Sequence, residues 1–185
     1  ANNLNYLNYF KSDSHINYIG GRELTYRYLN YIDKNFKRKN LGRLLAEQMS
    51  ISHKKYTGDI ALKINFSYSD AERKYYQDED IITLESKCLE NLKTDIPPEF
   101  KSMKKRETEY YKNKKSFTQQ KVLIFRDSSL TFFKDVFSVY FKEMLLYWDY
   151  WYFNEDLIKW YKPDIVLEIR TERFLENMKK EIDLE

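Results

Sequence analysis

The chain has 185 residues, of which 32 are Lys or Arg and 29 are Asp or Glu, and its formal net charge is +3. Hydrophobic residues make up 42% of it, enough apolar surface to exclude a disordered polyelectrolyte. One Cys and four Gly exclude a disulfide framework and a collagen-like repeat, and the small net charge does not indicate nucleic-acid binding. We expect a single domain over residues 1–185, with no transmembrane segment.

The N-terminal half predicts two helices. Residues 2–14 lack periodicity and are expected to be irregular. After Gly20-Gly21, apolar residues spaced by four predict a helix over residues 22–35, and a similar spacing predicts another over residues 40–49. Residues 56–60 then break the second helix. Residues 65–115 are less informative: they predict a strand at 81–84, a break at Pro97-Pro98, and otherwise loops with a short hairpin.

The C-terminal 65 residues show an alternating order of elements. A continuous apolar run predicts a buried strand over residues 121–125, and a second one predicts a strand over residues 164–169. Helices are expected over residues 130–146, 154–160 and 171–180. The charged residues within 130–146 favour a helix that faces the core over a membrane anchor. The order strand, helix, helix, strand, helix predicts an α/β fold with a mostly parallel sheet.

Ser128 occupies the turn between the first of these strands and the long helix that we expect after it. Such a turn lifts a side chain to the carboxyl edge of the sheet, where the first N–H groups and the dipole of a helix stabilise an oxyanion. Ser is also among the best helix N-cap residues. The local sequence therefore leaves two interpretations of Ser128 open, a nucleophile and a cap.

A serine nucleophile requires a base near neutral pH, and the chain has only two histidines. His15 follows Asp13 by two positions, so a tight turn lets the carboxylate hold one ring nitrogen while the other faces the nucleophile. The alternative is a loop histidine bonded to its own turn. His53 has no neighbouring carboxylate and is expected to face solvent. One Cys and two His without ligand spacing make no credible zinc site, so we expect no metal and no cofactor.

Four short motifs occur in one order along the chain. Residues 13–21 read Asp-Ser-His-Ile-Asn-Tyr-Ile-Gly-Gly, and residues 57–61 read Thr-Gly-Asp-Ile-Ala. Residues 125–130 read Phe-Arg-Asp-Ser-Ser-Leu, and Lys-Pro-Asp-Ile-Val-Leu at 162–167 precedes Glu-Arg-Phe-Leu at 172–175. Together they resemble the Asp-x-His-Trp, Gly-Asp-Leu-Ala, Gly-Asp-Ser-Leu-like and Lys-Pro-Asp-(Val/Ile)-Val segments of the SGNH-hydrolase-like domain in the alginate O-acetyltransferase family (the AlgJ/AlgX and DHHW type).

The resemblance implies an SGNH-hydrolase-like three-layer fold of permuted order, in which the Asp-x-His segment precedes the serine. It assigns Ser128 as nucleophile, His15 as base and Asp13 as the acid that orients His15. Residues of the same motifs are expected to bind the oxyanion or the substrate: Ser129, Asn17, Arg126 and Arg173. The implied activity is acetyl transfer to an exported or cell-surface polysaccharide through an acetyl-serine, outside the cytoplasm, with a membrane partner supplying the acetyl group.

The sequence departs from the family pattern at three places. Ile16 replaces the usual Trp, Arg126 replaces a Gly, and Ser129 replaces Phe or Leu. Family domains also begin well upstream of the Asp-x-His segment, so we expect a domain truncated at its N-terminus or a sheet completed differently. Two alternative functions remain open: a carbohydrate acetyl esterase that uses the same triad, and a non-catalytic carbohydrate-binding or assembly subunit.

Overall fold

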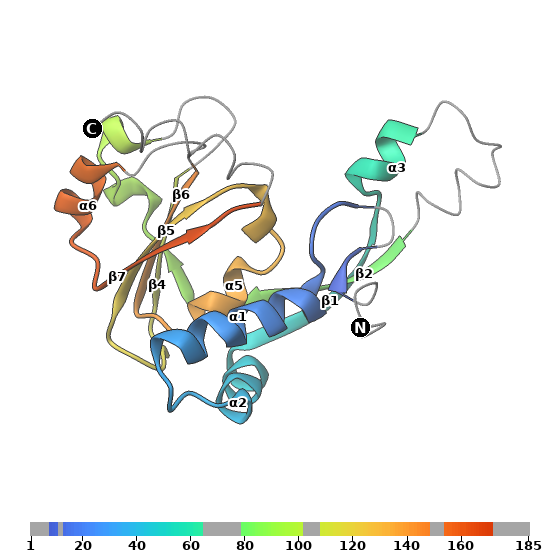
Figure 1. Ribbon diagram of the computed structural model, residues 1–185, viewed down its shortest axis with the longest axis horizontal. Helices are drawn as coiled ribbons and strands as arrows, with labels where there is room; N and C mark the ends of the chain where they lie inside the picture. Colours follow the sequence, from blue (N-terminus) through green and yellow to red (C-terminus); the bar gives the residue numbers. More distant parts are fainter. Residues whose placement is uncertain (1–7, 11–12, 65–78, 102–107, 149–153, 172–185) are drawn as a thin grey trace, which may run out of the picture. The chain divides into compact units, whose positions relative to one another are not determined.

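The computed structural model describes residues 8–10, 13–64, 79–101, 108–148 and 154–171 (Figure 1). The chain forms two compact units, the first made of residues 1–87 and 132–136 and the second of residues 88–131 and 137–185. Because the segment 132–136 belongs to the first unit, the chain passes between the units at three places. That residues 1–185 form a single domain stays a prediction.

In its described part, the first unit contains three whole helices, a two-stranded antiparallel sheet and the first three residues of a helix at 134–138. Strand β1 (Met49–Tyr56) pairs with β2 (Glu79–Ser86) so that Met49 lies opposite Ser86 and Tyr56 opposite Glu79. The predicted strand at 81–84 is confirmed within β2, whereas β1 was not predicted. The helices are α1 (Tyr18–Ile32), α2 (Arg38–Gln48) and α3 (Asp59–Ile64). The helix expected at 40–49 is confirmed as α2.

Helix α1 begins four residues before the predicted start at Arg22, because Gly20 and Gly21 lie inside it. Asn17 caps the helix by accepting from the N–H groups of Ile19 and Gly20. A Cβ on Gly20 would lie 2.5 Å from the Asn8 carbonyl oxygen, and one on Gly21 would lie 2.3 Å from Cβ of Phe133. The two glycines are therefore required by close packing of the helix, and do not mark a break.

The second unit is built on a five-stranded sheet in the order β3-β4-β6-β5-β7. Strand β5 is parallel to β6 and to β7, whereas β4 is antiparallel to both β3 and β6. The α/β class is confirmed, but the sheet is mixed and its mostly parallel character is not confirmed. The bounds are β3 (Leu89–Asn91), β4 (Glu109–Asn113), β5 (Lys121–Arg126), β6 (Glu143–Trp148) and β7 (Ile165–Ile169).

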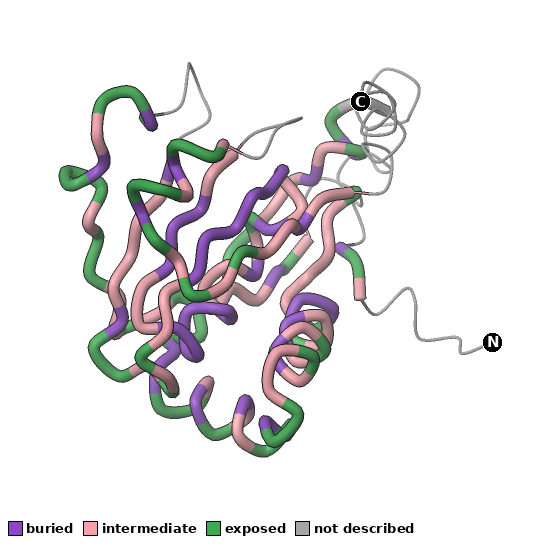
Figure 2. The backbone as a smooth tube through the Cα atoms, turned by 60° about the vertical axis from the view of Figure 1, so that its left-hand side comes forward, coloured by how far each residue is buried: buried purple, intermediate pink, exposed green. Residues whose placement is uncertain are grey.

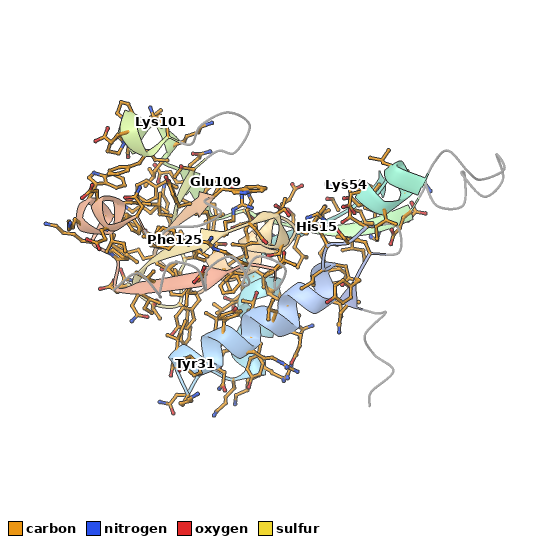
Figure 3. All side chains as sticks on the ribbon, turned by 45° about the horizontal axis from the view of Figure 1, so that its top comes forward. His15, Tyr31, Lys54, Lys101, Glu109 and Phe125 are labelled. Carbon is orange, nitrogen blue, oxygen red and sulfur yellow. The ribbon has the colours of Figure 1, made fainter. Side chains whose placement is uncertain are left out.

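Helix α6 (Glu155–Tyr161) covers one face of this sheet. Its Leu157 and Tyr161 pack with Leu123, Phe125 and Leu145 in one buried cluster. Buried residues are concentrated in the central strands (Figure 2), and Phe125 lies inside the unit (Figure 3). The predicted helix at 154–160 and the predicted strands at 121–125 and 164–169 are confirmed. The short 3-10 helices of this unit are η2 (Lys93–Asp95), η3 (Pro98–Phe100) and η4 (Ser128–Leu130).

The helix predicted over residues 130–146 is wrong. This segment contains the end of η4, the five-residue helix α5 (Lys134–Ser138) and most of strand β6. Met144, Leu145 and Leu146 are all buried, because β6 is a central strand covered on both faces. A central strand reads as a continuous apolar run, which periodicity does not separate from a buried helix.

The last predicted helix, at 171–180, lies outside the described residues except for Thr171, which is not helical. Within the described ranges no helix combines the length and the apolar character needed to cross a bilayer.

Candidate active site

Asp13 and His15 form a hydrogen-bonded pair in the first unit. Nδ1 of His15 bonds to Oδ1 of Asp13, and the same oxygen accepts the His15 backbone N–H at 2.7 Å. The Asp13 side chain is 1% exposed and that of His15 is 20% exposed. The carboxylate selects the tautomer with a proton on Nδ1. No described residue forms a hydrogen bond with Nε2, so this nitrogen is the one available for proton transfer.

The second oxygen of Asp13 is held by hydrogen bonds from the last residue of strand β1 and from the turn that follows this strand. Oδ2 accepts the Tyr56 hydroxyl and, at 2.9 Å, the Asp59 N–H. Asp59 in turn accepts from the Ser14 N–H at 2.8 Å and the Ser14 hydroxyl at 3.0 Å. The loop that contains Asp13 and Ser14 and the turn that contains Asp59 therefore hydrogen-bond to each other in both directions. Both oxygens of the carboxylate that orients His15 accept hydrogen bonds.

The surroundings of Asp13 decide its charge. Burial favours the neutral form and would raise the pKa of Asp13, but hydrogen bonds from Tyr56, Asp59 and His15 outweigh burial and hold its pKa below the ordinary value. Burial, and then the bond to the Asp13 carboxylate, raise the pKa of Tyr56 well above its ordinary value. At neutral pH Asp13 is thus an anion, and Tyr56 is a neutral donor.

Asp13, His15 and Asp59 also lie close enough together to be considered as metal ligands, with ligand atoms within 4.8 Å of one another. However, both oxygens of Asp13 already accept hydrogen bonds, and Asp59 accepts two from Ser14. A cation would have to displace these N–H and O–H donors, which point positive charge at the oxygens. We interpret the group as a hydrogen-bonded cluster.

Three aromatic rings support the histidine within the first unit. The Phe132 ring centroid lies 5.5 Å from that of His15, 4.7 Å from that of Phe10 and 5.5 Å from that of Tyr56. Aromatic contacts of this kind favour fixed relative orientations. The imidazole is therefore restrained by its tilted contact with Phe132, at 58° between the ring planes, and by Asp13 at Nδ1.

Ser128 lies in the second unit, where it opens the 3-10 helix η4 directly after β5. The cap of η4 is Asp127, whose side chain accepts the Ser129 N–H at 2.7 Å. Capping thus falls to Asp127 and not to Ser128. No described residue forms a hydrogen bond with the Ser128 hydroxyl, which leaves this oxygen available for chemistry.

Asp127 also ties the ends of two parallel strands together. Its Oδ2 accepts the Thr171 N–H at 2.8 Å and the Thr171 hydroxyl at 2.6 Å, just after β7 ends. Burial alone would raise the pKa of Asp127, but the bonds from Ser129 and Thr171 outweigh it and lower the pKa. The residue before Ser128 is therefore a fixed, ionised anchor.

Contacts of the other predicted site residues favour structural roles. Asn17 caps α1. Arg126 is 3% exposed, pairs with Glu109 and stacks over the Trp148 ring at 4.5 Å. Ser129 donates its N–H to Asp127, so this N–H is not available to bind an oxyanion. The long helix whose dipole was expected to stabilise the oxyanion is replaced by the short helices η4 and α5. Arg173 lies outside the described residues.

Tyr56 was not predicted as a site residue, since no local pattern links it to Asp13 43 positions away. Asp59 belongs to a motif that the sequence did single out, Thr57-Gly58-Asp59, although its role as a donor to Asp13 was not foreseen. The first unit also has an open pocket of about 390 Å³ beside Tyr9 and Ile16. His15 is not among the residues that line this pocket.

A scan of known protein families and a search of curated proteins both find no match to the chain. Solved structures do match. A DHHW family protein from Eubacterium siraeum has a TM-score of 0.65 at 14% identity, over 94% of this chain and 63% of that one. PatB1 from Bacillus cereus, solved with a sulfonyl adduct, has a TM-score of 0.59 at 13% identity, over 91% of this chain and 61% of that one.

A second PatB1 structure matches with a TM-score of 0.56 at 13% identity, over 91% of this chain and 63% of that one. The chain thus spans somewhat over three fifths of the length of these proteins. At such identities the likeness shows the fold alone. It supports a DHHW-type or related fold, and does not confirm the SGNH-hydrolase-like and alginate parts of the predicted resemblance.

Proposed function

We propose that the protein is a serine-dependent O-acetyltransferase in which Ser128 is the nucleophile, His15 the general base and Asp13 the residue that orients His15. The observation that carries the proposal is the Asp13–His15 pair, in which Nδ1 is bonded to a buried carboxylate and Nε2 has no described partner. This is the arrangement that a histidine base needs when it takes a proton from a hydroxyl.

Ser128 is close along the chain to a residue that contacts His15. Phe132, whose ring packs on His15, follows Ser128 by only four positions. Even a fully extended chain would keep the Cα atoms of Ser128 and Phe132 within roughly 14 Å of each other. The serine is therefore tethered to a residue that contacts the proposed base.

The proposed reaction has two steps. Nε2 of His15 takes the Ser128 hydroxyl proton as Oγ attacks the acetyl carbonyl carbon, and the leaving oxygen departs with that proton to give acetyl-Ser128. Nε2 then takes a proton from an acceptor hydroxyl, which attacks the acetyl carbon. The bond to Oγ breaks, and Ser128 regains its proton. Water in place of the acceptor would give an acetyl esterase, so water exclusion separates the two activities.

The acceptor and the setting are parts of the same proposal. We assign a hydroxyl of an exported or cell-surface polysaccharide as acceptor, a membrane partner as the source of acetyl groups, and an extracytoplasmic location. These assignments rest on the motif resemblance. The fold they require is supported by the likeness to a DHHW family protein and to PatB1.

Release of nitrophenol from its acetyl ester tests the mechanism. We expect Ser128→Ala and His15→Ala to lose this activity, and His53→Ala and Ser129→Ala to keep it. His53 is a suitable control because it lies exposed on β1, as predicted. Activity retained by Ser128→Ala, or lost in His53→Ala, would contradict the assignment. Acetyl transfer to an oligosaccharide, detected as added mass, separates a transferase from an esterase.

A sulfonyl fluoride provides a second test that needs no substrate. Sulfonyl reagents react with activated nucleophilic side chains, and PatB1, which is similar in fold, has been solved with a sulfonyl adduct. We expect labelling at Ser128 by peptide mass analysis, with the rate greatly reduced in His15→Ala. Labelling at Ser129 instead would place the nucleophile one residue later.

The observation that favours the alternative, a carbohydrate-binding subunit, is the pocket in the first unit. Tyr9, which is 48% exposed, lies beside it and offers a stacking surface for a sugar ring. Under this alternative, Tyr9→Ala would abolish glycan binding, whereas Ser128→Ala would leave binding unchanged and no ester hydrolysis would be measurable in the wild type.

A further inference from the structure

Tyr56 is bonded to Asp13, the orienting member of the proposed catalytic pair. Its hydroxyl donates to Oδ2 of Asp13, while Oδ1 of the same carboxylate accepts from His15. Tyr56 is the last residue of β1, where it lies opposite Glu79 of β2. Its ring packs 5.4 Å from that of Phe10 and 5.5 Å from that of Phe132. The hydroxyl is thus held at a fixed point by both backbone and ring.

The orientation of Asp13 needs such a fixed donor. The terminal torsion of an aspartate is broad, so the carboxylate plane is set by its hydrogen-bond partners. Two donors hold Oδ2, the Tyr56 hydroxyl and the Asp59 N–H, and the side chain is 1% exposed. A water molecule therefore has little access to replace a lost donor, and an unsatisfied buried oxygen is costly.

We infer that Tyr56 is a positioning residue for the proposed reaction, because its hydroxyl locks the plane of the Asp13 carboxylate and through it the tautomer and direction of the His15 ring. This inference rests on the proposed function for its kinetic consequence. Its structural content, that Tyr56 holds the Asp13–His15 bond in place, stands whether or not Ser128 is the nucleophile. Tyr56 can donate this hydrogen bond only when its hydroxyl is protonated, and its raised pKa keeps it protonated at neutral pH.

The chain offers a matched control. Tyr110 of β4 in the second unit donates its hydroxyl to Oε2 of Glu143 at 2.7 Å, and it is also partly buried with a raised pKa. Tyr56→Phe and Tyr110→Phe remove the same atom from the same kind of bond. Both keep the aromatic ring, so both preserve the packing against neighbouring rings.

The test compares these two variants by NMR and by kinetics. In the wild type we expect a slowly exchanging, far-downfield proton resonance from His15 Nδ1. It is readily assigned because the chain has only two histidines and His53→Gln removes the other. Tyr56→Phe should shift or broaden this resonance and lower kcat for acetyl-ester hydrolysis about tenfold with KM unchanged. Tyr110→Phe should change neither readout.

Either readout can overturn the inference. A His15 resonance that is the same in Tyr56→Phe and wild type would show that the hydroxyl does not hold the pair. A kcat lowered equally by both substitutions would show a general effect of stability. If instead Ser128→Ala retains full hydrolysis, the proposed function fails, while the NMR comparison still tests Tyr56.

Discussion

At the scale of single residues, two aspartates organise the proposed chemistry in the same way. Asp13 accepts the backbone N–H of His15 two residues on, and Asp127 accepts that of Ser129 two residues on. Each is thus an Asx-turn that shapes its own loop. The second oxygen of each carboxylate accepts two donors more than forty positions away, from Tyr56 and Asp59 for Asp13 and from Thr171 for Asp127. One aspartate therefore orients the proposed base, and the other anchors the residue next to the proposed nucleophile.

Asp127→Asn should change how stability depends on pH. The pKa of Asp127 is lowered in the folded protein, so its carboxylate contributes stability above the ordinary value of 3.8. That contribution is lost as pH falls from about 3.8 through the lower folded value. The variant should therefore be less stable than wild type at pH 7, and the difference should shrink towards pH 2. Urea unfolding at several pH values measures it.

The matched control for this prediction is Asp156→Asn, since the Asp156 side chain is 82% exposed and bonded only at the surface to Lys159. Surface pairs contribute little, so its stability should follow that of the wild type at every pH. A constant offset of Asp127→Asn from pH 7 to pH 2 would contradict the linkage, because it would show a loss independent of charge.

Gly21→Ala should destabilise the first unit. The added Cβ would lie 2.3 Å from Cβ of Phe133, on a segment whose neighbour Phe132 packs against His15. Overpacking of this kind costs about 1–3 kcal/mol. Gly42→Ala, in α2, meets only Arg22 Nη2 at 3.8 Å and should stabilise the protein by about 0.5–1 kcal/mol, because alanine is the better helix former. Thermal unfolding compares the two, and equal effects would contradict the packing argument.

Local contacts in the candidate site were predictable from the sequence, and distant ones were not. The Asp13–His15 pair spans two positions, so the spacing alone indicated it. Tyr56 and Thr171 reach their aspartates only through the fold, across 43 and 44 positions. A pattern of residue types within one segment carries no information about such pairs. The cap of η4 is a local feature, and the sequence left it open at Ser128, whereas Asp127 forms it.

At the scale of helices and strands, the success of the sequence predictions depended on how each element is capped and buried. Helix α6 was predicted well because its ends carry sequence signals, with Asn154 at its N-cap and Pro163 two residues after its last helical residue. Strand β6 was read as helix because both of its faces are covered, which removes the alternation that marks a strand. Strand β1 was missed for the opposite reason, since nearly all of its residues are exposed and no apolar stripe appears.

The N-cap of α6 should contribute measurably to the stability of the second unit. Asn154 Oδ1 accepts the Leu157 N–H at 2.9 Å, and Leu157 is fully buried in the core of the second unit. Asn154→Ala should lower the free energy of unfolding by about 1 kcal/mol. Asn154→Asp keeps an acceptor at the cap and should stay within a few tenths of a kcal/mol of wild type. Equal losses in both variants would show that the amide group, and not the cap, is needed.

At the scale of the whole molecule, the chain crosses between the two units at three places, which bears on whether the units unfold cooperatively. Residues 132–136 belong to the first unit, although both flanking segments belong to the second. Unfolding of the second unit would release both ends of this segment and weaken the contact of Phe132 with His15 and that of Phe133 with Gly21. We therefore expect the units to unfold together.

Leu157→Ala tests this cooperativity from the core of the second unit. Removing a fully buried leucine costs about 2–5 kcal/mol, and Val166→Ala on β7, where the side chain is 38% exposed, serves as the mild control. If the units unfold together, hydrogen exchange in Leu157→Ala should accelerate in α1 of the first unit by as much as in β5 of the second. Faster exchange confined to β5 would mean that the first unit keeps its Asp13–His15 pair after the second has opened, and that the predicted single domain is in fact two.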